Sequence, residues 1–72
     1  MEALRNLCAN LKRLRKAQGL TQEALAEKAG LEYKYYQKIE SGRWPGLQLS
    51  TVERLAKALR VEAGELLLRP PK

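Results

Sequence analysis

Apolar residues recur along most of the chain at the three- and four-residue spacing of an amphipathic helix. In the first segment this apolar stripe consists of Leu4, Leu7, Cys8, Leu11 and Leu14. A glycine follows at position 19, and glycine commonly ends a helix. The pattern therefore predicts a first helix that ends there. It also places Cys8 on the buried stripe, as a small apolar side chain rather than a reactive thiol.

Two short helices are predicted next, with Gly30 between them. Thr21 precedes the second helix, and its hydroxyl is suited to capping the first turn. The third helix covers roughly residues 32–41. Tyr36 and Ile39 have the spacing of an inner face, so we expect both to lie in the core.

A fourth helix is predicted to begin around Ser50, because Ser50 and Glu53 have the spacing of a capping box. A short fifth helix follows at about residues 63–68, before a proline-containing tail at 69–72. No segment shows the alternation typical of a strand. We therefore expect an all-α fold, a compact bundle of five short helices forming a single domain over residues 1–72.

The charge balance narrows the range of partners. Fourteen Lys and Arg against eight Asp and Glu give a formal net charge of +6. Such an excess favours polyanions, either nucleic acid or an anionic membrane, although a solvated basic surface without a partner also fits it. No stretch approaches the roughly 18 apolar residues of a membrane span, and the start of the chain does not resemble a signal peptide. We expect a cytoplasmic protein with no membrane partner.

The chain contains few residues suited to catalysis or metal binding. The chain has no histidine, and Cys8 is its single cysteine. An ordinary zinc or iron site needs several thiolate or imidazole ligands, and activated nucleophiles usually need a histidine partner. The acids are scattered along polar helix faces. We therefore expect a protein that is not an enzyme, with no metal, no cofactor and no small-molecule ligand.

The connection between the second and third helices carries the functional signal. Two short helices joined by a tight glycine-containing turn outline a helix-turn-helix at about residues 21–41. The chain resembles the Cro and phage-repressor (xenobiotic-response-element type) family in the run GLTQEALAEKAGL…YYQKIESGR…P, followed by LSTVERLAKALRV…GELL. The resemblance covers about residues 11–68. It implies a lambda-repressor-like domain that binds double-stranded DNA sequence-specifically, as a transcriptional regulator of the repressor type acting as a homodimer on a palindromic operator.

The outward face of the third helix is the candidate for contact with bases. A helical wheel places donors and one aromatic ring there, and no acid: Tyr33, Lys34, Gln37, Lys38 and Ser41. The major groove presents acceptors on purines and a methyl group on thymine, which such side chains match. An ordinary solvated helix face is the alternative. The resemblance places Tyr33, Lys34 and Lys38 at base-contacting positions, with Gln37 as a further candidate.

Phosphate contacts are expected from Gln22, Ser41 and Arg43. Gln22 begins the second helix, where free amides and the helix dipole favour an anion. The resemblance gives Gln22 a bridging role between phosphate and the recognition helix, and an ordinary first-turn glutamine is the alternative. It also aligns Ser41 and Arg43 with phosphate-clamping positions. Two residues depart from or fall outside this pattern: Glu32 replaces the usual Ser or Thr cap, and Trp44 either packs against its loop or stacks on a sugar.

Arg15 is a charged residue on the apolar side of the first helix. At 100° per residue it falls close to Leu4 and Leu11, so it points toward the core and needs a partner. In the family that this chain resembles, a matching arginine pairs with the glutamate that ends the third helix. The resemblance therefore implies a structural ion pair between Arg15 and Glu40.

One helix face cannot bury all of Leu66, Leu67 and Leu68, so at least one should face outward. The resemblance implies a two-fold contact through this fifth helix, which would set two recognition helices about 34 Å apart along DNA. The alternative for these leucines is a fraying tail. Two other functions stay open: an antitoxin or adaptor whose main partner is a protein, and a nonspecific nucleic-acid binder driven by charge.

Overall fold

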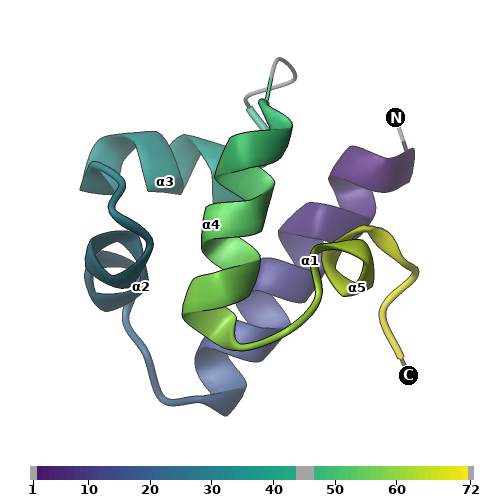
Figure 1. Ribbon diagram of the computed structural model, residues 1–72, viewed down its shortest axis with the longest axis horizontal. Helices are drawn as coiled ribbons and strands as arrows, with labels where there is room; N and C mark the ends of the chain where they lie inside the picture. The colour runs from purple at the N-terminus through teal and green to yellow at the C-terminus, as the bar shows by residue number, and fades with distance from the viewer. Residues whose placement is uncertain (1, 44–46, 72) are drawn as a thin grey trace.

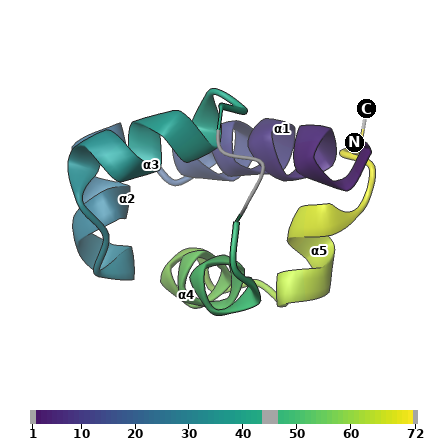
Figure 2. The ribbon, with the colours of Figure 1, turned by 90° about the horizontal axis from the view of Figure 1, so that it is seen from above.

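The structure, a computed structural model, describes residues 2–43 and 47–71, and this part of the chain forms five helices and no strand. They are α1 (Glu2–Ala17), α2 (Gln22–Ala29), α3 (Tyr33–Glu40), α4 (Leu49–Leu59) and α5 (Ala63–Leu67). α1 and α3 lie on one side of the bundle and α4 on the other, while α2 and α5 close its two ends (Figures 1 and 2). The expected all-α bundle of five helices is confirmed.

All five helices contribute to one core. α1 packs against α3 and α5, and α4 packs against α2 and α5. Burial of a large apolar side chain stabilises a fold by about 1.5–3 kcal/mol, so the side chains that lose all contact with water supply most of the driving force. The large apolar side chains with almost no exposure are Leu7, Leu11, Leu25, Tyr36, Ile39, Leu55, Leu59 and Leu66.

The start of α4 differs from the expectation. The helix begins at Leu49, and its N-cap is Gln48, whose side chain makes no capping hydrogen bond. Ser50 lies inside the first turn, where its hydroxyl is 3.4 Å from the Gln48 side-chain oxygen. A capping box needs the serine in an extended conformation before the first turn, so the predicted box between Ser50 and Glu53 is wrong.

Cys8 also differs from the expectation, because its side chain is only partly buried. The thiol lies at the edge of the contact between α1 and α3, where it donates a hydrogen bond to the carbonyl oxygen of Ile39 at 3.1 Å. Burial raises the pKa of the Cys8 thiol, and the negative charge of Glu40 raises it further. The group is therefore held in its protonated form, which is a poor nucleophile.

Asparagine amides tie α5 to α1. Asn10 is 1% exposed and donates to the carbonyl oxygens of Leu66 and Leu68 at 2.9 and 2.8 Å. Asn6 donates to the carbonyl oxygen of Leu67 at 3.1 Å. The last carbonyls of a helix lack partners within the helix, so these amides replace the missing bonds. They set the position of α5 and of the chain that leaves it.

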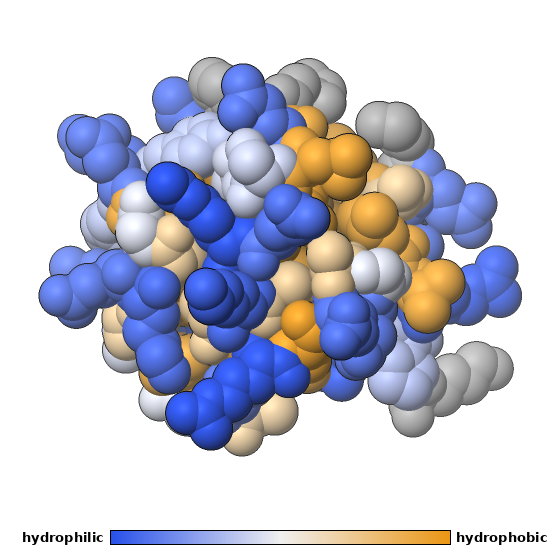
Figure 3. Space-filling model, viewed as in Figure 1, coloured by the Kyte–Doolittle hydropathy of each residue, from blue (hydrophilic) through white to orange (hydrophobic). Residues whose placement is uncertain are grey.

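An apolar groove lies between the N-terminal part of α1, the start of α4 and α5. Apolar surface gathers over these elements (Figure 3). Leu49, at the start of α4, is 70% exposed, and Leu68, just after α5, is 65% exposed. The groove is lined by Ala3, Leu4, Leu7, Leu47, Leu49, Val52 and Leu67.

None of the helices within the described residues has the length and apolar character required to cross a membrane.

Candidate nucleic-acid interface

The turn between α2 and α3 follows a helix whose two ends are both fixed by local backbone interactions. The Thr21 hydroxyl accepts a hydrogen bond from the backbone N–H of Ala24 at 3.0 Å, which confirms the predicted cap. Gly30 ends α2 with φ of 71°, a left-handed conformation that favours glycine. Glu32 precedes α3 without a side-chain capping bond. The result is a tight turn that sets the direction of α3 relative to α2.

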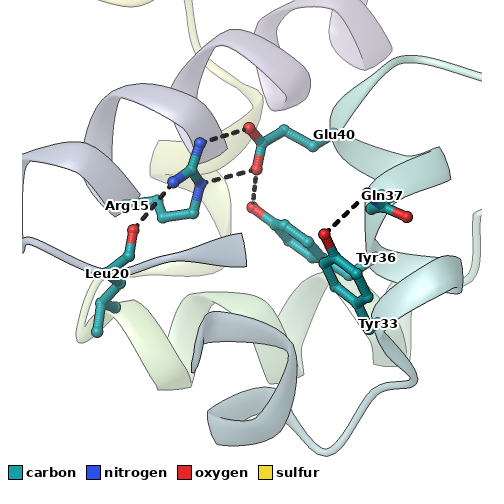
Figure 4. Close-up of polar contacts among 6 residues, drawn as sticks. All are labelled: Arg15, Leu20, Tyr33, Tyr36, Gln37 and Glu40. Carbon is teal, nitrogen blue, oxygen red and sulfur yellow. Dashed lines mark hydrogen bonds and ion pairs between the residues drawn. The ribbon is translucent and has the colours of Figure 1, made fainter. Parts of the chain in front are cut away.

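The inner side of α3 is held by a buried ion pair (Figure 4). Arg15 Nε and Nη2 each lie 3.0 Å from an oxygen of the Glu40 carboxylate, which is the bidentate arrangement. The side chain of Glu40 is 2% exposed and that of Arg15 12% exposed. Arg15 also donates to the carbonyl oxygen of Leu20 at 2.9 Å. One guanidinium therefore joins α1, the turn before α2 and the end of α3.

Tyr36 completes this cluster, which the sequence did not reveal. Its hydroxyl donates a hydrogen bond to Glu40 one turn further along α3. Burial raises the pKa of Tyr36, and the bond to Glu40 raises it further, so the hydroxyl keeps its proton. The available signal is the helical spacing of a tyrosine four residues before a glutamate. The apolar periodicity explains why the ring of Tyr36 is buried, but it gives no information about the partner of the hydroxyl group.

The ionisation of Glu40 reflects two opposing effects. Burial disfavours the charged carboxylate, but hydrogen bonds from Arg15 and Tyr36, together with the positive charge of Arg15, outweigh it. A hydrogen bond from Gln22 acts in the same direction. The pKa of Glu40 therefore lies below its ordinary value, and the charged form is the one the fold favours.

This lowered pKa makes part of the stability sensitive to acid. The contribution of Glu40 should be complete above the ordinary glutamate pKa of about 4.3 and be lost as the pH falls through the lowered value. The unfolding free energies of the wild type and Glu40→Gln, measured in urea, should converge as the pH falls from 7 toward 2. Glu53→Gln, at an exposed position on α4, is the control. A Glu40→Gln deficit that does not change with pH would contradict the assignment.

The outer side of α3 carries the predicted base-contacting residues. Tyr33, Lys34, Gln37 and Lys38 are all exposed. The Gln37 amide donates to the hydroxyl oxygen of Tyr33 at 3.0 Å, so these two side chains are held together (Figure 4). Ser41 is exposed as well, and its hydroxyl donates to the carbonyl oxygen of Lys38 at 3.0 Å.

A shallow polar hollow beside α3, here called the α3 hollow, brings the predicted base and phosphate contacts together. Its described lining residues include three cations and two amide side chains, and no carboxylate is among them. Tyr33 does not line the hollow, although it is bonded to Gln37. Trp44 lies outside the described residues. The lining residues are Gln22, Lys34, Gln37, Lys38, Ser41 and Arg43.

The three predicted dimer residues lie in different environments. Leu66 is 0% exposed and belongs to the core, so its side chain cannot reach a second molecule. The expectation that Leu66 belongs to a dimer interface is therefore wrong, because Leu66 is the residue of the short helix α5 that points into the core. Leu67 is partly buried, and Leu68 is exposed. Only Leu67 and Leu68 remain available for a contact.

Comparison with known proteins places this geometry among helix-turn-helix regulators. A family model described as "Helix-turn-helix domain" matches residues 6–69. The chain is similar to a hypothetical transcription factor of Neisseria meningitidis serogroup B, with 41% identity over 64 residues. That match covers 89% of this chain and 59% of the relative, so the chain spans less than two thirds of the relative's length.

Solved structures show the same arrangement of helices. The crystal structure of the hypothetical transcription factor NHTF from Neisseria is similar with a TM-score of 0.91 and 38% identity, covering 96% of this chain and 76% of that one. The restriction-modification controller protein C.AhdI from Aeromonas hydrophila has a TM-score of 0.80 and 38% identity, and the match covers 88% of this chain and 94% of that one. A SinR–SinI protein complex has a TM-score of 0.80 and 30% identity, and the match covers 85% of this chain and 59% of that one.

Proposed function

The chain belongs to the helix-turn-helix domain family, and on this premise we propose that it is a transcriptional regulator that binds specific sequences of double-stranded DNA through α3. The observation that carries the proposal is the α3 hollow, where cations and amides from α2, α3 and the segment after α3 converge and no acid is found among the lining residues that the structure describes. The proposed activity is binding alone, with no catalytic step.

The proposed recognition uses α3 in the major groove, which is wide enough for a helix. Lys34 and Lys38 are one turn apart on the same face and suit the acceptors of guanine. Gln37 suits adenine, and the Tyr33 ring suits a thymine methyl group. Because the other side of α3 is fixed through Glu40, these side chains are presented on a rigid element, which favours discrimination between sequences.

Phosphate contacts would hold α3 in register. Gln22 lies at the N-terminus of α2, where unpaired amides and the helix dipole favour a phosphate. Arg43 is exposed and supplies a full positive charge to the α3 hollow. Ser41 lines the same hollow. All three predicted phosphate contacts therefore lie beside the proposed base-contacting lysines.

We propose further that the regulator is a homodimer, and that it represses transcription from a palindromic operator. The support for the dimer is the exposed Leu68, which follows the partly buried Leu67 that lines the apolar groove. Exposed apolar surface of this kind is typical of interfaces. A two-fold contact would repeat α3 at about 34 Å along the DNA, which is the spacing of successive major grooves on one side.

Leu68→Lys is expected to weaken such a dimer by about tenfold or more, because each protomer would lose an apolar contact and gain a charge at the interface. Sedimentation equilibrium of the free protein would measure the change. Leu49→Lys tests how far the contact extends along the groove, since Leu49 is similarly exposed and lines the groove from α4. Tyr33→Lys, at an exposed apolar position on α3, is the control and should leave the dimer unchanged. Equal weakening by both leucine substitutions would move the contact from α5 toward α4, and no weakening by either would contradict the proposed dimer.

The experiment that tests the function is selection of bound DNA from a random duplex pool at near-physiological salt, followed by sequencing. Enrichment of a palindrome with half-sites about one helical turn apart is the expected result, and it would support both specific recognition and dimeric binding. Recovery of a pool with no enriched sequence would overturn the proposal in favour of nonspecific binding or of a protein partner.

A protein-binding adaptor or antitoxin is the second candidate. The observation that favours it is the similarity to SinR, whose structure was solved in a complex with the SinI protein. In that case the exposed leucines near α5, rather than the α3 hollow, would make the main contact. Apolar association depends little on salt, whereas binding to DNA weakens steeply as salt rises. The salt dependence of the principal interaction therefore separates the two functions.

A further inference from the structure

A second basic hollow lies between α2 and the C-terminal half of α4, here called the α2–α4 groove. It shares no lining residue with the α3 hollow. Hydrophilic side chains gather over these two helices (Figure 3), and α4 lies on the opposite side of the bundle from α3 (Figure 2). The groove is lined by Lys28, Ala29, Arg54, Lys57, Ala58 and Arg60.

The four cations of this groove are exposed, and none of them forms an ion pair with another described residue. Arg54 makes only a long hydrogen bond, of 3.4 Å, to the carbonyl oxygen of Gly30. Glu27 and Glu53 are next to Lys28 and Arg54 in the sequence, but neither lines the groove. The positive charge is therefore left to solvent or to a ligand.

The ends of the helices account for only part of this charge. α2 and α4 both end at this groove, and a helix C-terminus carries roughly half a negative charge. The two ends together offset about one of the four positive charges. The backbone N–H groups of Gly30 and Arg60 each bond to two carbonyls in the last turn of α2 and of α4. Interaction with the partial negative charges of the two helix C-termini therefore explains only a small part of the positive charge in the groove.

The remaining two lining residues decide which anion fits. Ala29 is 6% exposed and Ala58 is partly buried, so small apolar side chains lie among the four cations. A hollow lined by two alanines among four cations suits a small apolar side chain flanked by carboxylates. A nucleic-acid backbone offers phosphates to the cations but no small apolar group to the alanines. Charge and shape together therefore favour an acidic peptide over a second stretch of DNA.

We propose that the α2–α4 groove binds an acidic peptide segment of a partner protein, with Asp or Glu side chains on the four cations and an apolar side chain over the two alanines. Occupation of the groove leaves α3 accessible. Gln22 in the α3 hollow and Lys28 in the groove are separated by about 9 Å of helix, at 1.5 Å per residue. A peptide bound in the groove therefore occupies none of the residues that line the α3 hollow.

The test starts with a displayed library of short random peptides selected against the full chain, free of DNA. Acid-rich peptides carrying a small apolar residue are expected to be enriched. A synthetic copy of the most enriched peptide should bind the double variant Lys28→Gln, Lys57→Gln about fivefold or more weakly than the wild type, by fluorescence anisotropy. The matched control, Lys12→Gln, Lys16→Gln, loses the same charge from exposed positions on α1 and should change binding less than about twofold.

Chemical-shift mapping keeps the test independent of variant stability. The peptide should shift the amide resonances around the groove, and a short DNA duplex should shift those of α3 instead. Peptides without acidic residues, equal weakening by both double variants, or peptide shifts confined to α3 would each overturn the proposal. Duplex-induced shifts at the groove would also overturn it, and would assign the groove to nucleic acid. Failure of the DNA selection leaves this result unaffected, because the peptide selection needs no DNA.

Discussion

Glu40→Ala is expected to lower the free energy of unfolding by about 3–5 kcal/mol, the usual cost of leaving a buried charge without its partner. The substitution would leave the guanidinium of Arg15, only 12% exposed, without its bidentate acceptor, and the hydroxyl of Tyr36 without its carboxylate. Small domains have a total stability of about 5–15 kcal/mol, so the loss is a large fraction of the whole. Urea unfolding followed by circular dichroism would measure it.

A double-mutant cycle with Arg15→Met distinguishes the ion pair from general packing. Replacement of both charged partners by apolar residues is often far less costly than removal of one, so the double variant Arg15→Met, Glu40→Ala should be more stable than Glu40→Ala alone. Tyr36→Phe, which removes one hydroxyl, should cost about 1–3 kcal/mol. A Glu40→Ala loss below about 1 kcal/mol would show that the pair adds little, as an exposed pair does.

Replacing Lys34 and Lys38 by alanine is expected to have the second large effect, which is a loss of affinity for DNA. Removing each lysine from its base should cost about 1–3 kcal/mol of binding free energy on the selected sequence and relax the preference at that base. Both side chains are exposed on α3 and point away from the core, so folding should be little affected. Fluorescence anisotropy with the selected duplex and with a scrambled duplex would give the ratio of affinities.

The control for this variant removes the same charge from α1, with Lys12→Ala and Lys16→Ala. These exposed lysines lie outside the α3 hollow. Their loss should weaken binding to both duplexes by the same factor, because charge alone carries no sequence information. If the Lys34, Lys38 variant also weakened binding to both duplexes equally, the two lysines would be phosphate contacts and the base-contact assignment would fail.

The elements of the fold can be predicted with good accuracy because local chemistry sets them. The periodicity of Leu7 and Leu11 identifies the buried face of α1, and Thr21 and Gly30 mark both ends of α2. The predicted start of α4 is too late in the chain. A serine followed by a glutamate three positions later is an N-terminal signal only where the serine is extended, and Gln48 is the extended residue here.

The outer residues of the candidate site can be predicted from the resemblance to a known family. The buried contacts that hold α3 in place can be predicted only in part. The pair between Arg15 and Glu40 was expected, but its link to Tyr36 and to the Leu20 carbonyl was not. The amides that hold α5 were also unforeseen, since Asn10 has the sequence context of an ordinary polar residue. Bonds from Asn10 to α5 join positions far apart in the chain, and sequence spacing contains no information about them.

By itself, therefore, the sequence determined that the chain forms five amphipathic helices, where the turn between α2 and α3 lies, and that α3 presents cations and amides rather than acids. The tertiary structure alone decided which leucine of Leu66, Leu67 and Leu68 enters the core, how far Cys8 is exposed, and that the ends of α2 and α4 meet in a second basic groove. The physical reason is the range of the forces involved. Capping and periodicity act within a few residues of the chain, whereas burial and electrostatic grouping depend on which helices pack side by side.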